Sequence, residues 1–213
     1  LFARKEEFSA EDLARMGRYN TIKKKGDRVL GKKFVFDKIF FLEDGTTIVT
    51  AEEQFDQLTG PSGALAWIYN RWDVIALQYD QDGKLQHTYF IPKDLSGFKP
   101  SILGYSFLPA ERKSYFIYND YKSNLKRPLG QRPDIYARSA NPNIAVAVSI
   151  DRKGNMDREV LFEFKDYTAT LFSSQCQVIN SRTMFFYAEN VSFRARRVIR
   201  MGLIRVKGEE TKN

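Results

Sequence analysis

The chain has 213 residues, of which 43% are hydrophobic and 28% charged, and its formal net charge is +8. This size and composition fit one globular domain, or two small ones, and exclude a wholly disordered or collagen-like chain. The single histidine, His87, and the single cysteine, Cys176, exclude a Cys/His zinc site and an internal disulfide within one chain. No apolar run approaches the ~18 residues that a membrane-spanning helix needs.

The first 33 residues are expected to form a basic segment with one short helix. Ser9 can cap this helix, acidic residues follow in its first turn, and Gly17 can end it. The rest of the segment is rich in lysine and glycine, which favours a loop. Positive charge is concentrated here and in residues 194–213, whereas the middle of the chain is nearly neutral.

From residue 34 onward the pattern favours β-structure, because 14% of the chain is aromatic and β-branched residues are frequent. Hairpin turns are predicted at residues 43–46, 79–84 and 150–155, where acidic residues precede a glycine. The expected strands are residues 34–42, 46–55, 73–79, 84–91, 101–108, 113–118, 144–150, 156–164, 176–179 and 183–188. Residues 193–206 close the pattern as one long strand or a bent pair.

The strand pattern repeats along the chain. Asp80 and Asp151 are 71 residues apart, and so are Gly83 and Gly154. Each repeat consists of four short strands in two hairpins, which is typical of a β-propeller blade. We therefore expect an all-β fold: a partial β-propeller-like array of about three four-stranded antiparallel blades with a short N-terminal helix. A β-sandwich or two stacked meanders are the alternatives.

The expected organisation follows from these repeats. A basic N-terminal segment, residues 1–33, precedes blades at about 34–93, 100–165 and 174–207, and residues 208–213 form a tail. Known propellers close with at least about four blades. The chain is thus expected to be part of a larger propeller, completed by missing blades of the same chain or by a protein partner.

Several short motifs occur together in this order. They are Asp73–Asp80 with Asp82–Lys84, Ile91–Lys93, Phe116–Asp120 with Asn124, and Val146–Gly154 followed by Arg158–Phe162. Together they resemble an uncharacterised family of propeller-like cell-envelope proteins of the Bacteroidetes group, over roughly residues 34–205. The resemblance implies a propeller fold and a location in the periplasm or at the cell surface, and it implies no particular reaction.

One candidate site is a polar face at the ends of the second strands. In an antiparallel blade these ends lie on the same side as the links between blades, so their side chains should gather there. The candidate residues are Glu52, Glu53, Lys93, Asn119, Asp120, Asn124, Glu189 and Asn190. Two such carboxylates could serve as the acid and the nucleophile or base of a glycosidase. The alternative is that these residues cap strands and bind backbone groups.

Two further surfaces are candidates for binding. Trp67, Tyr69 and Trp72 form an aromatic cluster beside a loop, which suits a contact with a glycan or a partner. Arg194, Arg196, Arg197 and Arg200 form a basic patch that can bind anionic surfaces or protect a strand edge from aggregation. Residues 80–83 lack the further ligands of an EF-hand calcium loop, so they are interpreted as a turn.

These features favour a non-catalytic protein-interaction module of the bacterial cell envelope. The alternative function is a carbohydrate-binding or glycoside-cleaving propeller that uses its acidic face. Whether the chain is an enzyme is left open, and no cofactor or metal is expected. Nucleic acid is not expected as a partner, because no recognition motif accompanies the basic ends. Those ends would allow contact with an anionic membrane surface.

Overall fold

The computed structural model describes residues 34–61, 64–110, 113–129, 143–167, 169–190 and 198–207. Within these residues the protein is all-β, with about 64% of residues in strands and every strand pair antiparallel. The one α-helix in the described ranges is the single turn α2 (Phe164–Tyr167). Across the same ranges, no helix has the length and apolar character needed to span a membrane. The predicted N-terminal helix lies outside the described residues.

Three antiparallel sheets follow one another along the chain. The first sheet contains β1 (Phe34–Phe41), β2 (Thr47–Thr59), β3 (Ala66–Tyr79), β4 (Leu85–Ile91) and β5 (Leu95–Gly97). Its strands are ordered β1-β2-β3-β4, and β5 continues the line of β4 along the same edge of β3. The second sheet contains β6 (Tyr105–Pro109), β7 (Lys113–Asp120), β8 (Ile144–Asp151) and β9 (Met156–Glu163), in chain order.

The third sheet is narrower than the other two. It contains β10 (Thr170–Leu171), β11 (Gln177–Asn180), β12 (Thr183–Glu189) and β13 (Ile199–Arg205). The short strands β10 and β11 pair with successive parts of one edge of β12, and β13 pairs with the other edge. The third sheet is therefore three strands wide, whereas the first two sheets are four strands wide.

The hairpin turns that the sequence predicts are confirmed. Gly45, Gly83 and Gly154 have φ values of +82°, +73° and +85°, which a glycine adopts without strain. The side chains of Asp80 and Asp151 stabilise their turns in the same way. Each Oδ1 accepts hydrogen bonds from the backbone N–H groups two and four residues ahead, at 2.8–3.0 Å. Both turns join the third and fourth strands of their sheets, so the 71-residue offset marks a repeated structural unit.

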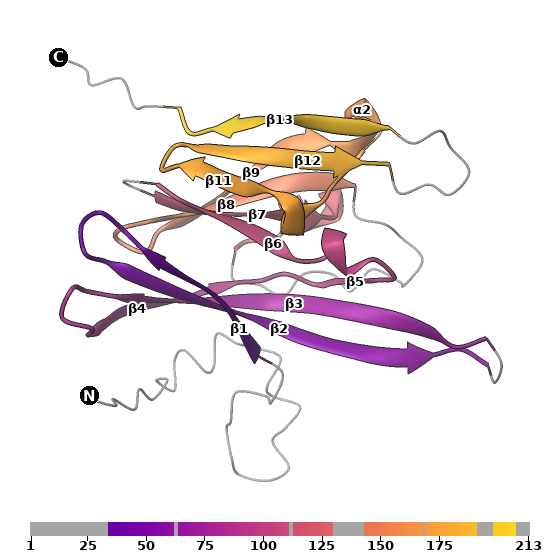
Figure 1. Cartoon of the computed structure of the whole chain (residues 1–213), viewed down its shortest axis with the longest axis horizontal. Helices are drawn as coiled ribbons and strands as arrows, with labels where there is room; N and C mark the ends of the chain where they lie inside the picture. The colour runs from indigo at the N-terminus through magenta and orange to yellow at the C-terminus, as the bar shows by residue number, and fades with distance from the viewer. Residues whose placement is uncertain are drawn as a thin grey trace, which may run out of the picture.

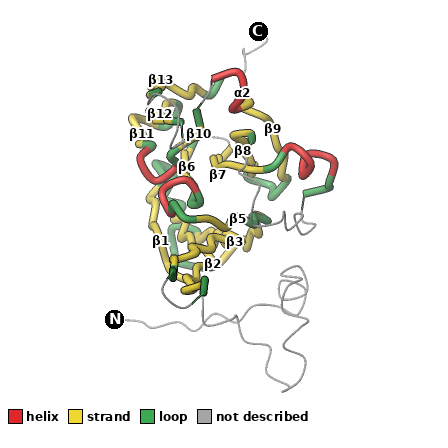
Figure 2. The backbone as a smooth tube through the Cα atoms, turned by 90° about the vertical axis from the view of Figure 1, so that its right-hand side faces the viewer, coloured by secondary structure: helices red, strands yellow, loops and turns green. Residues whose placement is uncertain are grey.

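The three sheets are stacked, with the second sheet in the middle (Figures 1 and 2). One core lies between the first and second sheets and includes Ile48, Val74, Ile91, Phe107, Phe116 and Val148. Another lies between the second and third sheets and includes Leu108, Ile117, Ala147, Leu171 and Met184. Because the second sheet is covered on both faces, every residue of β8 from Ile144 to Ile150 is buried. This explains why its sequence is a continuous apolar run rather than an alternating one.

A third core closes the end of the stack at which each sheet passes to the next. It contains Leu95 of β5, Ile102 and Leu103 of the link between the first and second sheets, Tyr121 after β7 and Phe172 after β10. Three short 3-10 turns occur in this part of the fold. They are η2 (Pro100–Ile102) in the link between the first and second sheets, η3 (Lys122–Lys126) between β7 and β8, and η4 (Ser173–Gln175) between β10 and β11. We call this end of the stack the linking end. The candidate polar face lies beside it.

The two outer faces of the stack expose large apolar side chains. On β1, Phe36 is 74% and Phe41 is 80% exposed, while the intervening Phe40 packs against the first core. On β13, Met201 is 65% exposed, and its neighbour two positions along, Leu203, is exposed as well. The described residues form an open stack of three sheets and no closed ring (Figure 1).

Candidate functional site

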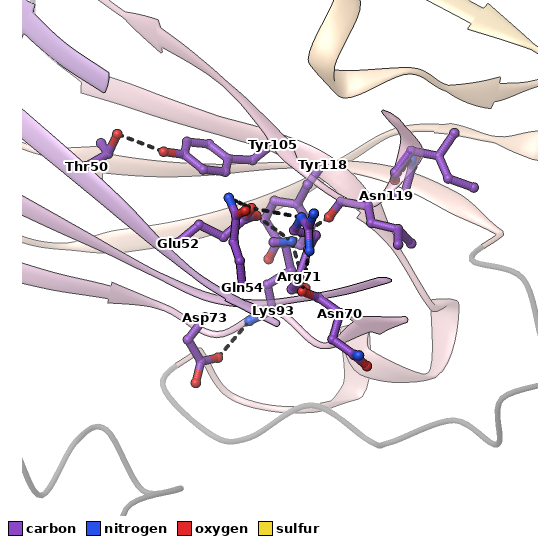
Figure 3. Close-up of polar contacts among 12 residues, drawn as sticks. Thr50, Glu52, Gln54, Asn70, Arg71, Asp73, Lys93, Tyr105, Tyr118 and Asn119 are labelled. Atoms are coloured by element: carbon purple, nitrogen blue, oxygen red, sulfur yellow. Dashed lines mark hydrogen bonds and ion pairs between the residues drawn. The ribbon is translucent and has the colours of Figure 1, made fainter. Parts of the chain in front are cut away.

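The candidate polar face contains a buried ion pair between Glu52 and Lys93. Glu52 lies on β2 and points towards the second sheet, and Lys93 lies in the link between β4 and β5 (Figure 3). Lys93 Nζ is 2.8 Å from Glu52 Oε1, and Lys93 is 1% exposed. The other carboxylate oxygen of Glu52 accepts a hydrogen bond from Gln54 Nε2 at 2.9 Å and lies 4.0 Å from Arg71 Nε. A charged pair at this depth is stable only when its remaining hydrogen-bonding groups are satisfied.

All three ammonium protons of Lys93 have acceptors. Besides Glu52, Nζ donates to the backbone carbonyl oxygen of Arg71 at 2.9 Å and to that of Leu103. The backbone N–H of Lys93 donates to Asp73 Oδ1 at 3.1 Å. Burial lowers the pKa of the Lys93 amine, and the neighbouring Glu52 carboxylate opposes that shift. Lys93 thus fastens β2 and β3 of the first sheet to the segment that leads into the second sheet.

Asn119 makes the corresponding connection from the second sheet. Asn119 is the second-last residue of β7 and is fully buried. Its Nδ2 donates to the carbonyl oxygens of Ile102 and Leu171, both at 2.7 Å. Ile102 precedes the Leu103 carbonyl that Lys93 binds, and Leu171 belongs to the third sheet. One amide group therefore connects the second sheet to the third sheet and to the link that leads from the first sheet.

Asp120 and Asn124 form a second buried pair. Asp120 Oδ1 accepts hydrogen bonds from the backbone N–H of Tyr121 and from Asn124 Nδ2, each at 2.7 Å. Burial raises the pKa of the Asp120 carboxyl above its ordinary value of 3.8, although these hydrogen bonds oppose the shift. The Asn124 carbonyl accepts a hydrogen bond from Arg158 Nη2 at 2.6 Å, which ties the 3-10 turn η3 to β9.

The remaining candidates of this face have separate partners. Glu53 is buried on β2, next to Glu52. Glu189 ends β12 in the third sheet, Asn190 follows it, and both are half-buried. Glu189 Oε2 accepts a hydrogen bond from the Tyr187 hydroxyl at 2.7 Å, and Asn190 Oδ1 accepts one from the backbone N–H of Val198 at 3.1 Å. The structure thus joins Glu52 to Lys93 and Asp120 to Asn124.

The polar groups of this face mainly hold neighbouring strands and links together. Six of its eight candidates are buried: Glu52, Glu53, Lys93, Asn119, Asp120 and Asn124. A carboxylate that holds a buried ammonium group is not presented to a sugar or to water. No group of three His, Cys, Asp or Glu residues in the described part of the chain is arranged to hold a metal ion. Lys93 and Asn119 donate to backbone carbonyl oxygens, and Asp120 accepts a hydrogen bond from the backbone N–H of Tyr121.

The three candidate aromatic residues have different environments. Trp67 is 53% exposed near the start of β3. Tyr69 packs against the core at the linking end, and the Arg71 guanidinium lies over its ring at 5.8 Å. Trp72 is half-buried and makes an edge-to-face contact with Phe55, with ring centroids 4.4 Å apart. Trp67 is therefore the most exposed of the three residues.

The basic patch is described only at Arg200. This residue is exposed on β13, and its Nη1 donates to the Ile199 carbonyl at 3.4 Å. Arg194, Arg196 and Arg197 lie outside the described residues.

Comparison with known proteins gives no match: no protein-family model, no curated protein and no solved structure shows significant similarity to the chain. Function must therefore be argued from the geometry and from the sequence motifs alone.

Sequence reasoning missed two contributors to the buried network. The Tyr105 hydroxyl donates to Thr50 Oγ1 at 2.7 Å across the interface between the first and second sheets. Arg71 shares its guanidinium between Glu52 and Asp56, with Nη1 2.7 Å from Asp56 Oδ1. Thr50 and Glu52 follow the core residue Ile48 at two-residue intervals along β2, so all three side chains lie on the same, inward face of the strand. This two-residue spacing is the sequence signal that could have revealed the buried polar network.

Proposed function

We propose that this chain is a non-catalytic protein-interaction module of the bacterial cell envelope and part of a larger β-propeller. In this proposal its two outer faces join the neighbouring blades of that propeller. The observation that carries the proposal is the exposure of large apolar residues on both faces, above all Phe36, Phe41 and Met201. Soluble monomers rarely expose contiguous apolar patches of this kind, which instead mark interaction surfaces.

The repeated architecture supports a further sheet as the partner of each outer face. Inside the stack, each sheet buries an apolar face against the next sheet, and both interfaces are formed by clusters of buried apolar residues. Repeat units that cannot bury an apolar face alone do so against a neighbouring copy of the unit. The two outer faces also expose large apolar residues, on β1 and on β13. A further antiparallel sheet is the partner that fits them best.

The location in the cell envelope is supported by the motifs that resemble the Bacteroidetes family, and by no other observation. The alternative function, a carbohydrate-binding or glycoside-cleaving propeller, has less support. Its acidic candidates Glu52 and Asp120 are buried and hydrogen-bonded rather than open to a ligand.

The proposal is tested by the association of the isolated chain. Without neighbouring blades, the outer face of the first sheet of one copy should pack on the outer face of the third sheet of another. Sedimentation at ~0.15 M salt should then show concentration-dependent self-association. Replacing Phe41→Glu and Met201→Glu together should shift the chain towards the monomer, because a carboxylate on either face opposes desolvation.

The control variant is Gln175→Glu, which adds a carboxylate at an exposed position of the 3-10 turn η4, at the linking end rather than on a strand of either outer face. It should associate like the parent chain. A parent chain that remains monomeric over the accessible concentration range would contradict the proposal, and so would equal association of all three proteins.

A further inference from the structure

The hairpin formed by β2 and β3 is longer than the rest of the sheet that contains it. These strands have 13 and 14 residues, whereas the neighbouring strands β1 and β4 have 8 and 7. Among the described residues, β2 after Glu53 and β3 before Tyr69 pair only with each other. Figure 1 shows this part of the hairpin extending beyond the ends of the other strands. It is a projecting two-stranded ribbon, and we call its residues 58–61 and 64–67 the hairpin tip.

The hairpin tip exposes large apolar side chains and carries no charge. Leu58 and Trp67 are paired across the two strands and are 49% and 53% exposed. Leu65 is 56% exposed. Residues 57–70 contain no charged side chain, although 28% of the chain is charged. The tip can therefore leave water without the desolvation of a charge, which is the most costly part of such a transfer.

Polarity increases in a fixed order from the hairpin tip towards the body. Leu65 lies nearest the turn, and Trp67 follows it along β3. Tyr69 comes next, and then Arg71, which pairs with Asp56 at 2.7 Å. A bilayer surface has the same order: acyl chains, then a belt that tryptophan and tyrosine prefer, then charged headgroups and water. This gradient favours a lipid surface over a groove in a protein as the occupant of the tip.

The backbone of the ribbon determines how deep the tip can enter. Thr59 and Ala66 are paired across the strands, and the Ala64 N–H donates to the Pro61 carbonyl oxygen at 3.0 Å. Within the described residues, no further strand pairs with the two outward edges of this ribbon. The backbone groups on those edges need water or headgroups as partners, so the tip suits the interfacial region and not the hydrocarbon centre. The net charge of +8 would add attraction to anionic lipids.

We propose that the hairpin tip inserts into the interfacial region of a lipid bilayer, where Leu58, Leu65 and Trp67 contact the acyl chains beside the headgroups. This proposal rests on the tip of the β2–β3 hairpin. The proposed function rests instead on the outer faces formed by β1 and β13. Lipid binding and self-association are measured separately, so either proposal can fail while the other holds.

The test uses the full chain with Trp72→Phe, in which Trp67 is the one remaining tryptophan. The vesicles consist of phosphatidylcholine alone or with roughly one quarter phosphatidylglycerol. On addition of either vesicle, the Trp67 emission should shift to shorter wavelength, and phosphatidylcholine brominated on its acyl chains should quench it. Binding should be tighter with the anionic lipid but should persist without it, because the insertion of apolar groups needs no charge.

Two matched variants of the full chain locate the contact. Leu65→Glu and Ile179→Glu each replace an aliphatic side chain of nearly equal exposure, 56% and 57%, with a carboxylate. Ile179 lies on β11 of the third sheet and not on the hairpin. Leu65→Glu should weaken vesicle binding about tenfold or more, because the carboxylate opposes transfer from water. Ile179→Glu should bind like the parent chain, and circular dichroism should show that both variants are folded.

Three results would overturn the proposal. A parent chain that binds neither vesicle would leave the tip to a protein partner. Binding that requires the anionic lipid, disappears at ~0.5 M salt and leaves the Trp67 emission unchanged would assign the contact to the basic ends of the chain. Equal binding by the two glutamate variants would assign it to another apolar surface, such as the outer faces.

Discussion

Removal of the buried ammonium group by Lys93→Met should destabilise the fold strongly. The methionine side chain fills a similar volume, but it leaves the Glu52 carboxylate without the group 2.8 Å away that neutralises it. It also leaves the carbonyl oxygens of Arg71 and Leu103 without this donor. Arg71 Nε, at 4.0 Å, compensates only in part.

The expected magnitude follows from the burial of both partners, whose side chains are 0% and 3% exposed. Breaking a fully buried ion pair by removing one partner costs about 3–5 kcal/mol. For a domain of this size, each kcal/mol lowers the melting temperature by about 2–4 °C, so the loss should be about 6–20 °C. Urea unfolding followed by tryptophan fluorescence and circular dichroism measures the free-energy change directly.

Two further variants test whether the loss of stability comes from the buried, unpaired charge. The double variant Glu52→Gln with Lys93→Met should recover a large part of the lost stability, because no uncompensated charge remains. The matched control is Lys165→Met, since Lys165 pairs with Glu163 at 3.1 Å on the surface. That control should unfold at the same urea concentration as the parent. A Lys93→Met protein within about 1 kcal/mol of the parent would refute the reasoning, since it would mean that the pair is not desolvated.

Two other predictions concern the second and third sheets. Because burial raises the pKa of Asp120 above 3.8, its ionisation should reduce stability as the pH rises from that value through the raised pKa. Asp120→Asn should remove this loss while its Oδ1 still accepts both hydrogen bonds. Urea unfolding should therefore show that the stability advantage of the variant over the parent grows as the pH rises from about 4. An advantage that shrinks instead would contradict this. Gly202→Ala would place a Cβ 2.6 Å from the Phe186 ring and should cost about 1–3 kcal/mol. Gly104→Ala, with 3.9 Å to the nearest side chain, should cost less in the same assay, and equal losses would refute the steric argument.

The parts of the fold that could be predicted from the sequence are those set by local chemistry. An aspartate followed three residues later by glycine produced the turns at Asp80 and Asp151, and their equal spacing from the flanking strands revealed the repeat. These turns depend on a side chain that binds nearby backbone N–H groups and on a residue that tolerates positive φ. Both conditions are visible in a short stretch of sequence.

The environment of the candidate polar face could not be predicted in the same way. Strand connectivity correctly brought Glu52 and Lys93 together, but whether the pair faced water depended on the second sheet and on the Leu103 carbonyl. That carbonyl belongs to a link whose path follows from packing at the linking end rather than from a local motif. Burial of a polar group is thus a property of the assembled stack.

The distribution of polar and apolar groups supports the role in assembly. Charged and amide groups such as Lys93 and Asn119 are buried at the linking end, where their hydrogen bonds join strands to the links between sheets or to the next sheet. Large apolar groups such as Phe41 and Met201 are exposed on the outer faces. Hydrogen-bonded groups with fixed geometry define how the sheets are stacked, because misaligned stacking would leave them unsatisfied. A stack aligned in this way holds the exposed apolar residues of β1 and β13 in fixed positions, and in the proposed function a further sheet docks on them.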